Sequence, residues 1–259
     1  MAIPRILHQT YRSADAVPAA LRPGIARLRA MNPGWDYRFY DDAAVEDFIR
    51  SEYKPEFHRA YRRINPVYGP ARADFFRYLL MYRYGGVYLD LKSTTVRPLD
   101  ETLRADDVYV LAFWPNQPHQ SVPHAGMHRV LSEQGFVRGE LQNWHIIVAP
   151  RHPLLQYVIS FMMHCIQAHA GDPQVCGRHG VLMTTGPIMY TLALARGLGA
   201  YAHRVVDSSD DLGLRYSSVE RHDLHFPGHY AGQTAPVILP EPDGVPVQAP
   251  RGPQELARS

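Results

Sequence analysis

Four charged residues in one short stretch of the sequence have types and spacings that could build a polar ligand site. Asp74 and Arg77 are three residues apart, and Asp90 and Lys92 are two residues apart. On a helix the first spacing places both side chains on one face, and on a strand the second spacing places both on one side. Carboxylate oxygens can hold a divalent cation, and an ammonium group is a point charge suited to phosphate. An isolated Asp–Arg pair at this spacing is usually an ordinary ion pair on a helix surface, so the elements around it decide its interpretation.

A helix followed directly by a strand is expected to carry these residues. The run from Pro70 to Tyr84 begins with a residue suited to a first helical turn and contains no further Pro and no Gly. Gly85 and Gly86 are expected to end the helix, since glycine adopts the left-handed closing conformation at little cost. The run from Val87 to Lys92 then alternates apolar and polar side chains, as a strand does. Asp90 is therefore expected near the carboxyl end of a strand, where ligands bind in open α/β sheets.

The same stretch resembles the sugar-binding region containing the DXD motif of glycosyltransferases. That family has the pattern A-D, two hydrophobic residues and R-Y, followed by G-G, a hydrophobic residue and Y-x-D-x-D. The matching residues are Ala73, Asp74, Phe75, Phe76, Arg77 and Tyr78, then Gly85, Gly86, Val87, Tyr88 and Asp90. The last position departs from the pattern, because Lys92 stands where the family has its second Asp. The likeness is to yeast-type initiating α-mannosyltransferases and to bacterial capsular and lipopolysaccharide sugar transferases, and it extends to the glucosylating domain of large clostridial toxins.

Other segments resemble the same family and extend the expected donor-binding site. The segment from Ile3 to Tyr11 is similar to its nucleotide-proximal strand, where Tyr11 would stack on the base in place of a Trp. Asn143 precedes a second strand-like run, and Thr185-Gly186 precedes a predicted helix whose start could bind an anion. Packing of Tyr11 over a strand end and turn capping by Asn143 are the alternatives. The donor-binding residues that the resemblance implies are His8, Gln9, Tyr11, Tyr78, Gly85, Gly86, Tyr88, Asn143, Thr185 and Gly186.

The resemblance implies a catalytic group made of Asp74, Arg77, Asp90 and Lys92, in which Asp74 and Arg77 bind hydroxyl groups of the donor sugar. Relatives hold Mn²⁺ or Mg²⁺ with the carboxylates of the D-x-D motif, but an ammonium group cannot bind a cation. Three interpretations are open. Lys92 itself neutralises the donor diphosphate and makes the enzyme independent of metal. Alternatively, Lys92 turns aside and a metal is held by Asp90 with a residue such as His229, or the site is degenerate and binds without turnover.

The whole chain of 259 residues is expected to form one α/β domain of the GT-A-like, Rossmann-like type over residues 1–235, followed by a Pro-rich tail at 236–259. A net charge of +2 does not indicate a nucleic-acid partner. The chain has two cysteines, no apolar leader at its start and no apolar run of membrane-spanning length. These features predict a cytoplasmic protein, with peripheral contact at the inner face of a membrane as the only route to a lipid-linked acceptor.

The function that the resemblance implies is transfer of a hexose from a UDP- or GDP-hexose to a hydroxyl of a saccharide or glycolipid. The relatives retain the anomeric configuration and act in the synthesis of surface polysaccharides or glycolipids. A catalytically degenerate protein that binds sugar nucleotides or glycans is the competing interpretation, and Lys92 motivates it. A metal-dependent phosphohydrolase is less favoured, because the spacing of the carboxylates and histidines does not suit a two-metal cluster.

Overall fold

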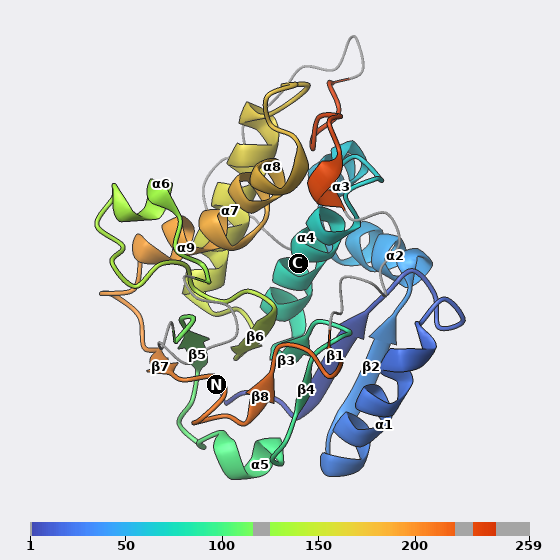
Figure 1. Cartoon of the computed structure of the whole chain (residues 1–259), viewed down its shortest axis with the longest axis vertical. Helices are drawn as coiled ribbons and strands as arrows, with labels where there is room; N and C mark the ends of the chain where they lie inside the picture. The colour runs from blue at the N-terminus through green and yellow to red at the C-terminus, as the bar shows by residue number, and fades with distance from the viewer. Residues whose placement is uncertain (1, 116–124, 221–229, 242–259) are drawn as a thin grey trace.

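The centre of the fold is a sheet with the strand order β2-β1-β3-β6-β5-β7 (Figure 1). The computed structural model describes residues 2–115, 125–220 and 230–241. The strands of this sheet are β1 (Ile6–Thr10), β2 (Asp36–Tyr40), β3 (Gly86–Leu89), β5 (Tyr109–Ala112), β6 (His145–Val148) and β7 (Arg204–Val206). β1 pairs in parallel with β2 and β3, β5 pairs in parallel with β7, and β6 is antiparallel to both β3 and β5. All strands of this sheet except β6 therefore run in one direction, and their carboxyl ends share one edge.

Helices and a small second sheet cover the two faces of the central sheet (Figure 1). The helices are η1 (Ala19–Leu21), α1 (Arg22–Met31), α2 (Asp42–Glu52), α3 (Pro55–Arg63), α4 (Gly69–Tyr84), α5 (Leu99–Thr102), α6 (Arg129–Ser132), α7 (Pro153–Ala168), α8 (Gly177–Thr184), α9 (Pro187–Ala195) and η3 (Tyr230–Gly232). The second sheet pairs β4 (Thr94–Thr95) with β8 (Leu214–Arg215). In the ranges that the structure describes, no helix has both the length and the apolarity needed to cross a bilayer.

Two apolar clusters hold these layers together. The larger one joins Tyr88 of β3 and Ile146 of β6 to buried side chains of α2, α3, α4, α7, α8 and α9. The smaller one joins Val87 and Leu89 to buried residues of α1, α5 and β8. The alternation predicted after Gly86 is therefore confirmed, since Tyr88 faces one cluster and its two neighbours face the other. The strand is shorter than predicted, however, because β3 ends at Leu89.

Gly85 and Gly86 let α4 turn directly into β3. Both have positive φ values, +65° and +101°, which side chains other than glycine rarely adopt. A Cβ atom on Gly85 would lie 2.6 Å from the backbone nitrogen of Pro150, and one on Gly86 would lie 2.5 Å from the carbonyl oxygen of Ile6 in β1. The predicted helix stop is confirmed, and the close approach of neighbouring backbones is a second reason for glycine at these positions.

The packed part of the chain extends beyond the predicted domain end at residue 235. Val237 and Ile238 are fully buried, and Ile238 forms β-bridges with Ile64 after α3 and with Ala170 after α7. The expectation of a poorly packed tail from Pro236 onward is therefore wrong for this segment, because two apolar side chains within it complete the core. Residues 242–259 of the expected tail lie outside the described part of the chain.

Candidate functional site

A buried cluster of two carboxylates and two cations lies where β3 ends. In α4, Arg77 Nη1 lies 3.3 Å from Asp74 Oδ1, and Arg77 Nη2 lies 2.8 Å from Asp90 Oδ1. Lys92 Nζ contacts the other carboxylate oxygen of Asp90, Oδ2, at 2.6 Å. The side chains of Asp74 and Arg77 are only 8% and 5% exposed, so they are not the exposed surface pair that their spacing alone would favour.

Lys92 reaches Asp90 because the chain turns immediately after β3. The N–H of Ser93 donates to the carbonyl oxygen of Asp90 at 2.8 Å, which closes a turn over these residues. The expectation that Asp90 and Lys92 project side by side from a strand is therefore wrong. The Lys92 ammonium folds back onto the Asp90 carboxylate and lies 4.3 Å from the centre of the Tyr216 ring.

Asp74 is hydrogen-bonded by residues from two distant parts of the chain. Asn143 Nδ2 donates to Asp74 Oδ1, and Thr185 Oγ1 donates to Asp74 Oδ2, each at 3.1 Å. Asn143 Nδ2 also lies 2.9 Å from the Tyr78 hydroxyl, and this hydroxyl donates to the carbonyl oxygen of Thr185 at 2.9 Å. The structure therefore brings Tyr78, Asn143 and Thr185 together around α4, as a network that fixes the Asp74 carboxylate.

The start of α9 does not offer the anion site that was expected from Thr185 and Gly186. The backbone N–H groups of both residues donate to the carbonyl oxygen of Val181 in α8, at 3.1 Å and 2.9 Å. The Thr185 hydroxyl is used by Asp74. These donors close the end of α8, so they are not available to a phosphate.

The carboxyl end of β1 lies against the same turn. Gln9 Nε2 donates to the carbonyl oxygen of Asp90 at 3.1 Å, and the Tyr37 hydroxyl donates to Gln9 Oε1 at 3.1 Å. Tyr11 is half-buried and packs with a small apolar cluster that includes Leu91. Gln9 is thus placed beside Asp90 and Tyr11 against the cluster that contains Leu91, and their contact with a nucleotide stays a prediction.

His8 lies inside the protein. Its side chain is fully buried, with Nε2 3.0 Å from the carbonyl oxygen of Gly85 and Nδ1 3.1 Å from the Tyr40 hydroxyl. Burial lowers the pKa of His8 to about 4, so the ring is neutral near pH 7. His8, Gly85 and Gly86 hold β1 against the connection between α4 and β3. His8 therefore helps to position the site.

Burial sets the electrostatics of the cluster. It raises the pKa of Asp74 to about 7, although the Arg77 guanidinium opposes this shift. Burial also disfavours the charged form of Lys92, but the Asp90 carboxylate outweighs it, and the pKa of Lys92 is raised. Burial likewise disfavours the charged form of Arg77, but its anionic neighbours, with Asp90 the strongest, outweigh burial and raise the pKa of Arg77. Both cations therefore stay charged, and an anionic ligand would compete with Asp90 for them.

The described residues of the cluster do not fit a divalent cation. Each oxygen of Asp90 already contacts a cationic side chain, and Lys92 would repel a metal ion placed beside it. In residues 2–115, 125–220 and 230–241, no three His, Cys, Asp or Glu side chains converge as a ligand set. His229, the partner proposed from the sequence, lies outside these ranges. The geometry offers the Lys92 ammonium where the D-x-D motif would offer its second carboxylate.

Sequence reasoning missed the aromatic side of the site. Tyr216 lies over Lys92, and its ring centre is 5.5 Å from that of Trp144 and 5.2 Å from that of Trp114. Tyr216 follows β8, which reaches the cluster by pairing with β4. Each of these strands has two residues, too few for a periodic signal, so only the folded structure could place Tyr216 here.

The mixed sheet, with a charged cluster at the edge formed by the carboxyl ends of its parallel strands, defines a GT-A-like nucleotide-diphospho-sugar fold. Solved structures support this class. One is "PaToxG Glycosyltransferase", with a TM-score of 0.53 and 15% identity over 76% of this chain and 71% of that chain. Another is the UDP-bound glycosyltransferase domain from the YGT toxin, with a TM-score of 0.51 and 8% identity over 84% of this chain and 81% of that chain. The predicted fold class is confirmed.

Residues 18–109 match the family described as "Glycosyltransferase sugar-binding region containing DXD motif". Mannosyl phosphorylinositol ceramide synthase SUR1 of Saccharomyces cerevisiae is 37% identical over 101 residues. Inositol phosphoceramide mannosyltransferase 3 of Schizosaccharomyces pombe is 34% identical over 102 residues. Each match covers 39% of this chain but only 25% and 28% of the relative, so this chain spans about a quarter of their length. The family resemblance drawn from the motif is confirmed.

Proposed function

We propose that this protein is a glycosyltransferase that moves a hexose from a UDP- or GDP-hexose to a hydroxyl of a saccharide or glycolipid. The observation that carries the proposal is the buried cluster of Asp74, Arg77 and Asp90, which are motif residues of the family and meet at the ligand-binding edge of the sheet. The names of the yeast relatives describe mannosyl transfer to inositol phosphoceramide, which favours a hexose donor and a glycolipid acceptor in glycolipid or surface polysaccharide synthesis.

The exposed fractions and contacts of the four side chains indicate which of them contact the donor and which position the others. The Asp90 side chain is 20% exposed, the largest value in the cluster, and those of Lys92, Asp74 and Arg77 are 11%, 8% and 5% exposed. We therefore assign donor contact to Asp90, and also to Lys92, because its ammonium lies against the Asp90 carboxylate and is a point charge suited to a diphosphate. Asp74 and Arg77 position Asp90, and Asn143 and Thr185 hold Asp74 in turn.

Lys92 supplies positive charge to the departing nucleoside diphosphate in this proposal. A leaving diphosphate gains negative charge in the transition state, and a preorganised cation stabilises it. When Lys92 moves from Asp90 to a phosphate, Arg77 still contacts both Asp90 and Asp74. The exchange therefore leaves no carboxylate of the cluster without a cation, and the reaction is expected to proceed without a metal.

Retention of the anomeric configuration is the stereochemical outcome we propose. A double displacement needs a carboxylate that is free to attack the sugar. Asp74 and Asp90, the two carboxylates of the cluster, are both held in ion pairs with Arg77. Transfer on the front face of the sugar fits these contacts: the acceptor hydroxyl bonds to the anomeric carbon as the diphosphate leaves, and its proton passes to the departing phosphate oxygen. The anomeric proton coupling in the product's NMR spectrum tests this assignment.

A protein that binds sugar nucleotides without turnover is the second candidate, because Lys92 holds the Asp90 oxygen nearest to it at 2.6 Å. The first experiment separates the two. Nucleoside diphosphate release is measured with UDP- and GDP-hexoses, with Mn²⁺ or with chelator, and with alkyl glycosides and free sugars as acceptors. An enzyme releases diphosphate from at least one donor, and by our proposal the chelator has no effect. Binding of a donor without any release would favour the binding protein.

Variants connect the activity to the site. Asp90→Asn removes the charge that Arg77 and Lys92 neutralise, and we expect donor turnover to fall by at least about 100-fold, the scale expected for loss of an electrostatic catalytic group. Asp47→Asn is the matched control, because Asp47 and Arg50 form an Asp–Arg pair at the same 2.8 Å distance as Asp90 and Arg77, but on the exposed surface of α2. Unchanged turnover in Asp90→Asn, or an equal loss in Asp47→Asn, would contradict the site assignment.

A further inference from the structure

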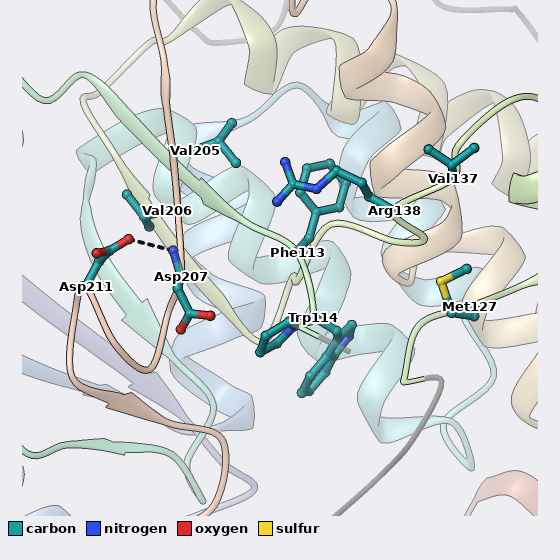
Figure 2. Close-up of a pocket in the computed structure, with 10 residues that line it drawn as sticks. Phe113, Trp114, Met127, Val137, Arg138, Val205, Val206, Asp207 and Asp211 are labelled. Atoms are coloured by element: carbon teal, nitrogen blue, oxygen red, sulfur yellow. Dashed lines mark hydrogen bonds between the residues drawn. The ribbon is translucent and has the colours of Figure 1, made fainter. Parts of the chain in front are cut away.

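A second site lies at the same edge of the sheet as the Asp90 cluster. A pocket of about 590 Å³ opens where β5 and β7 end (Figure 2). Phe113, Trp114 and Pro115 follow β5, and Asp207 follows β7. Because β3, β5 and β7 run in the same direction, the pocket and the Asp90 cluster lie on one side of the molecule.

One aromatic ring connects the pocket to the cluster. Tyr216 lies 5.2 Å from Trp114 in an edge-to-face contact, and Lys92 Nζ lies 4.3 Å from the centre of the Tyr216 ring. Trp114 lines the pocket. A molecule bound against Trp114 is therefore one ring away from the cation that we assign to the donor diphosphate.

Trp114 is held in place by a buried carboxylate. Its indole Nε1–H donates to Glu140 Oε1 at 2.8 Å, and the other oxygen of Glu140 lies 2.7 Å from His128 Nε2. The Glu140 side chain is only 9% exposed. This support fixes the ring before any ligand arrives, as a preorganised binding surface requires.

The rim of the pocket exposes large apolar side chains. Met127, Val137 and Val205 line the pocket and are 40%, 81% and 41% exposed, which makes them three of the eight exposed large hydrophobic residues in the described ranges. Clustering of such residues marks binding surfaces, since water contacts each of them unfavourably. Arg138 stacks its guanidinium 4.3 Å from the centre of the Phe113 ring at the same rim.

The side of the pocket that carries Val205 and Val206 also carries two carboxylates (Figure 2). Asp207 and Asp211 line it, and Figure 2 shows their carboxylates on the side away from Met127 and Val137. Asp207 Oδ1 accepts hydrogen bonds from the N–H groups of Ser209 and Asp210, so its carboxylate has a fixed position. The pocket thus combines hydrogen-bond acceptors, an aromatic ring and an apolar rim.

We propose that this pocket binds the acceptor and that the acceptor is amphiphilic, an inference that rests on the proposed function. Its hydroxyl-rich head lies between Trp114 and Asp207, because a flat aromatic ring covers the C–H face of a sugar and a carboxylate accepts hydrogen bonds from its hydroxyls. Its apolar part covers Met127, Val137 and Val205. A free saccharide would leave this rim exposed to water.

The test compares acceptors that differ only in their apolar part. Acceptor-dependent diphosphate release is measured with the methyl and the octyl glycoside of one hexose, below the concentration at which the octyl compound forms micelles. The octyl glycoside is expected to have a KM at least about tenfold lower, because its chain removes apolar rim surface from water. Equal KM values for the two glycosides would overturn the proposal.

Charged substitutions at the rim test whether these residues bind the octyl chain. Val205→Asp is expected to raise the KM of the octyl glycoside about tenfold and to change that of the methyl glycoside much less. Val137→Asp, in a loop, is a second variant with the same expectation. Val67→Asp is the control, since Val67 is another exposed valine, 47% exposed, that does not line this pocket. Equal effects of Val67→Asp and Val205→Asp would overturn the proposal.

A binding measurement keeps this inference separate from the proposed function. Octyl glycoside is titrated into the wild type, Trp114→Phe and Val205→Asp while tryptophan fluorescence is recorded without donor. A change in the wild type that is lost in Trp114→Phe and weakened in Val205→Asp supports the pocket even if no donor is turned over. If donors are hydrolysed but the titration and the KM values show no effect of the octyl chain, the pocket assignment fails and the glycosyltransferase assignment stands.

Discussion

Lys92 changes the chemistry of its motif because it replaces a carboxylate with an ammonium group inside a buried site. The ion pairs Lys92–Asp90 and Arg77–Asp90 give the Asp90 carboxylate one cation for each oxygen. A substitution at this position should therefore change the electrostatic balance of the whole cluster.

Lys92→Asp should make the protein respond to a divalent metal. The substitution removes one cation and places a second carboxylate two residues from Asp90, and their repulsion is relieved when a cation binds both. We expect Mn²⁺ to raise the melting temperature of Lys92→Asp and chelator to lower it, with little effect of either on the wild type. Lys92→Met is the control, because it removes the charge without adding a ligand. No metal-dependent stabilisation of Lys92→Asp would count against this account of the position.

Asp74 should make stability depend on pH. Burial raises its pKa from an ordinary value of 3.8 to about 7, so between these values the folded protein holds a proton that the unfolded chain has lost. The folded state binds more protons than the unfolded state in this range. The stability that Asp74 contributes therefore falls as pH rises. Asp74→Asn removes this titration and keeps an amide that can face Thr185 Oγ1. The free energy of unfolding in urea, measured from about pH 5 to about pH 8, should fall for the wild type relative to the variant. A constant difference between the two proteins across this range would refute the shift.

The sequence identified the charged residues of the site but not how they contact each other. Helix periodicity predicted that Asp74 and Arg77 share a face, and the motif grouped them with Asp90, which the structure places against Arg77. The motif did not show that Lys92 pairs with Asp90, since that contact depends on a turn. Tyr216 could not be predicted, because it approaches Lys92 from a segment more than a hundred residues away in the chain.

At the scale of elements, the junction between α4 and β3 decides whether the cluster can form. Its helix was predictable from composition and its end from the two glycines. The end of the strand was not predictable, because the alternation of apolar residues continues through Leu91. Leu91 is indeed buried, but in the small cluster with Val17 and Leu21 instead of the cluster that holds Leu89. A period of two cannot distinguish a longer strand from a turn that buries the next apolar residue elsewhere.

Gly86→Ala should destabilise the fold through this junction. Gly86 has a φ of +101°, and a Cβ atom there would lie 2.5 Å from the carbonyl oxygen of Ile6, which belongs to the backbone and cannot swing aside. We expect a loss of at least about 2 kcal/mol in the free energy of unfolding, from strain and displacement of β1. Gly69→Ala at the start of α4 is the control, because its Cβ would meet open space, and it should change stability by less than about 0.5 kcal/mol. Urea unfolding of both variants measures the difference, and similar values would contradict the close-approach explanation.

At the scale of the whole molecule, the segment near residue 238 connects α3, α7 and α8, which cover one face of the central sheet. Its Pro-rich composition predicted a loose tail, since the average over many residues hides two apolar ones. In the structure, Ile238 bridges Ile64 after α3 and Ala170 after α7, and Pro236 bridges Cys176 at the start of α8. Because α8 leads into Thr185, which donates to Asp74, this segment also supports the layer that holds the site.

Ile238→Ala should therefore reduce the stability of the whole domain. Ile238 is fully buried, and removing most of its side chain leaves a cavity that costs about 2–5 kcal/mol in comparable cores. The neighbouring residue gives the control: Leu239 is 36% exposed, and its N–H bond to the carbonyl oxygen of Arg63 is made by the backbone and survives substitution. Leu239→Ala is expected to cost less than about 1 kcal/mol in the free energy of unfolding. If the two variants unfold at the same urea concentration, Ile238 does not complete the core, and the packed domain ends where its composition first suggested.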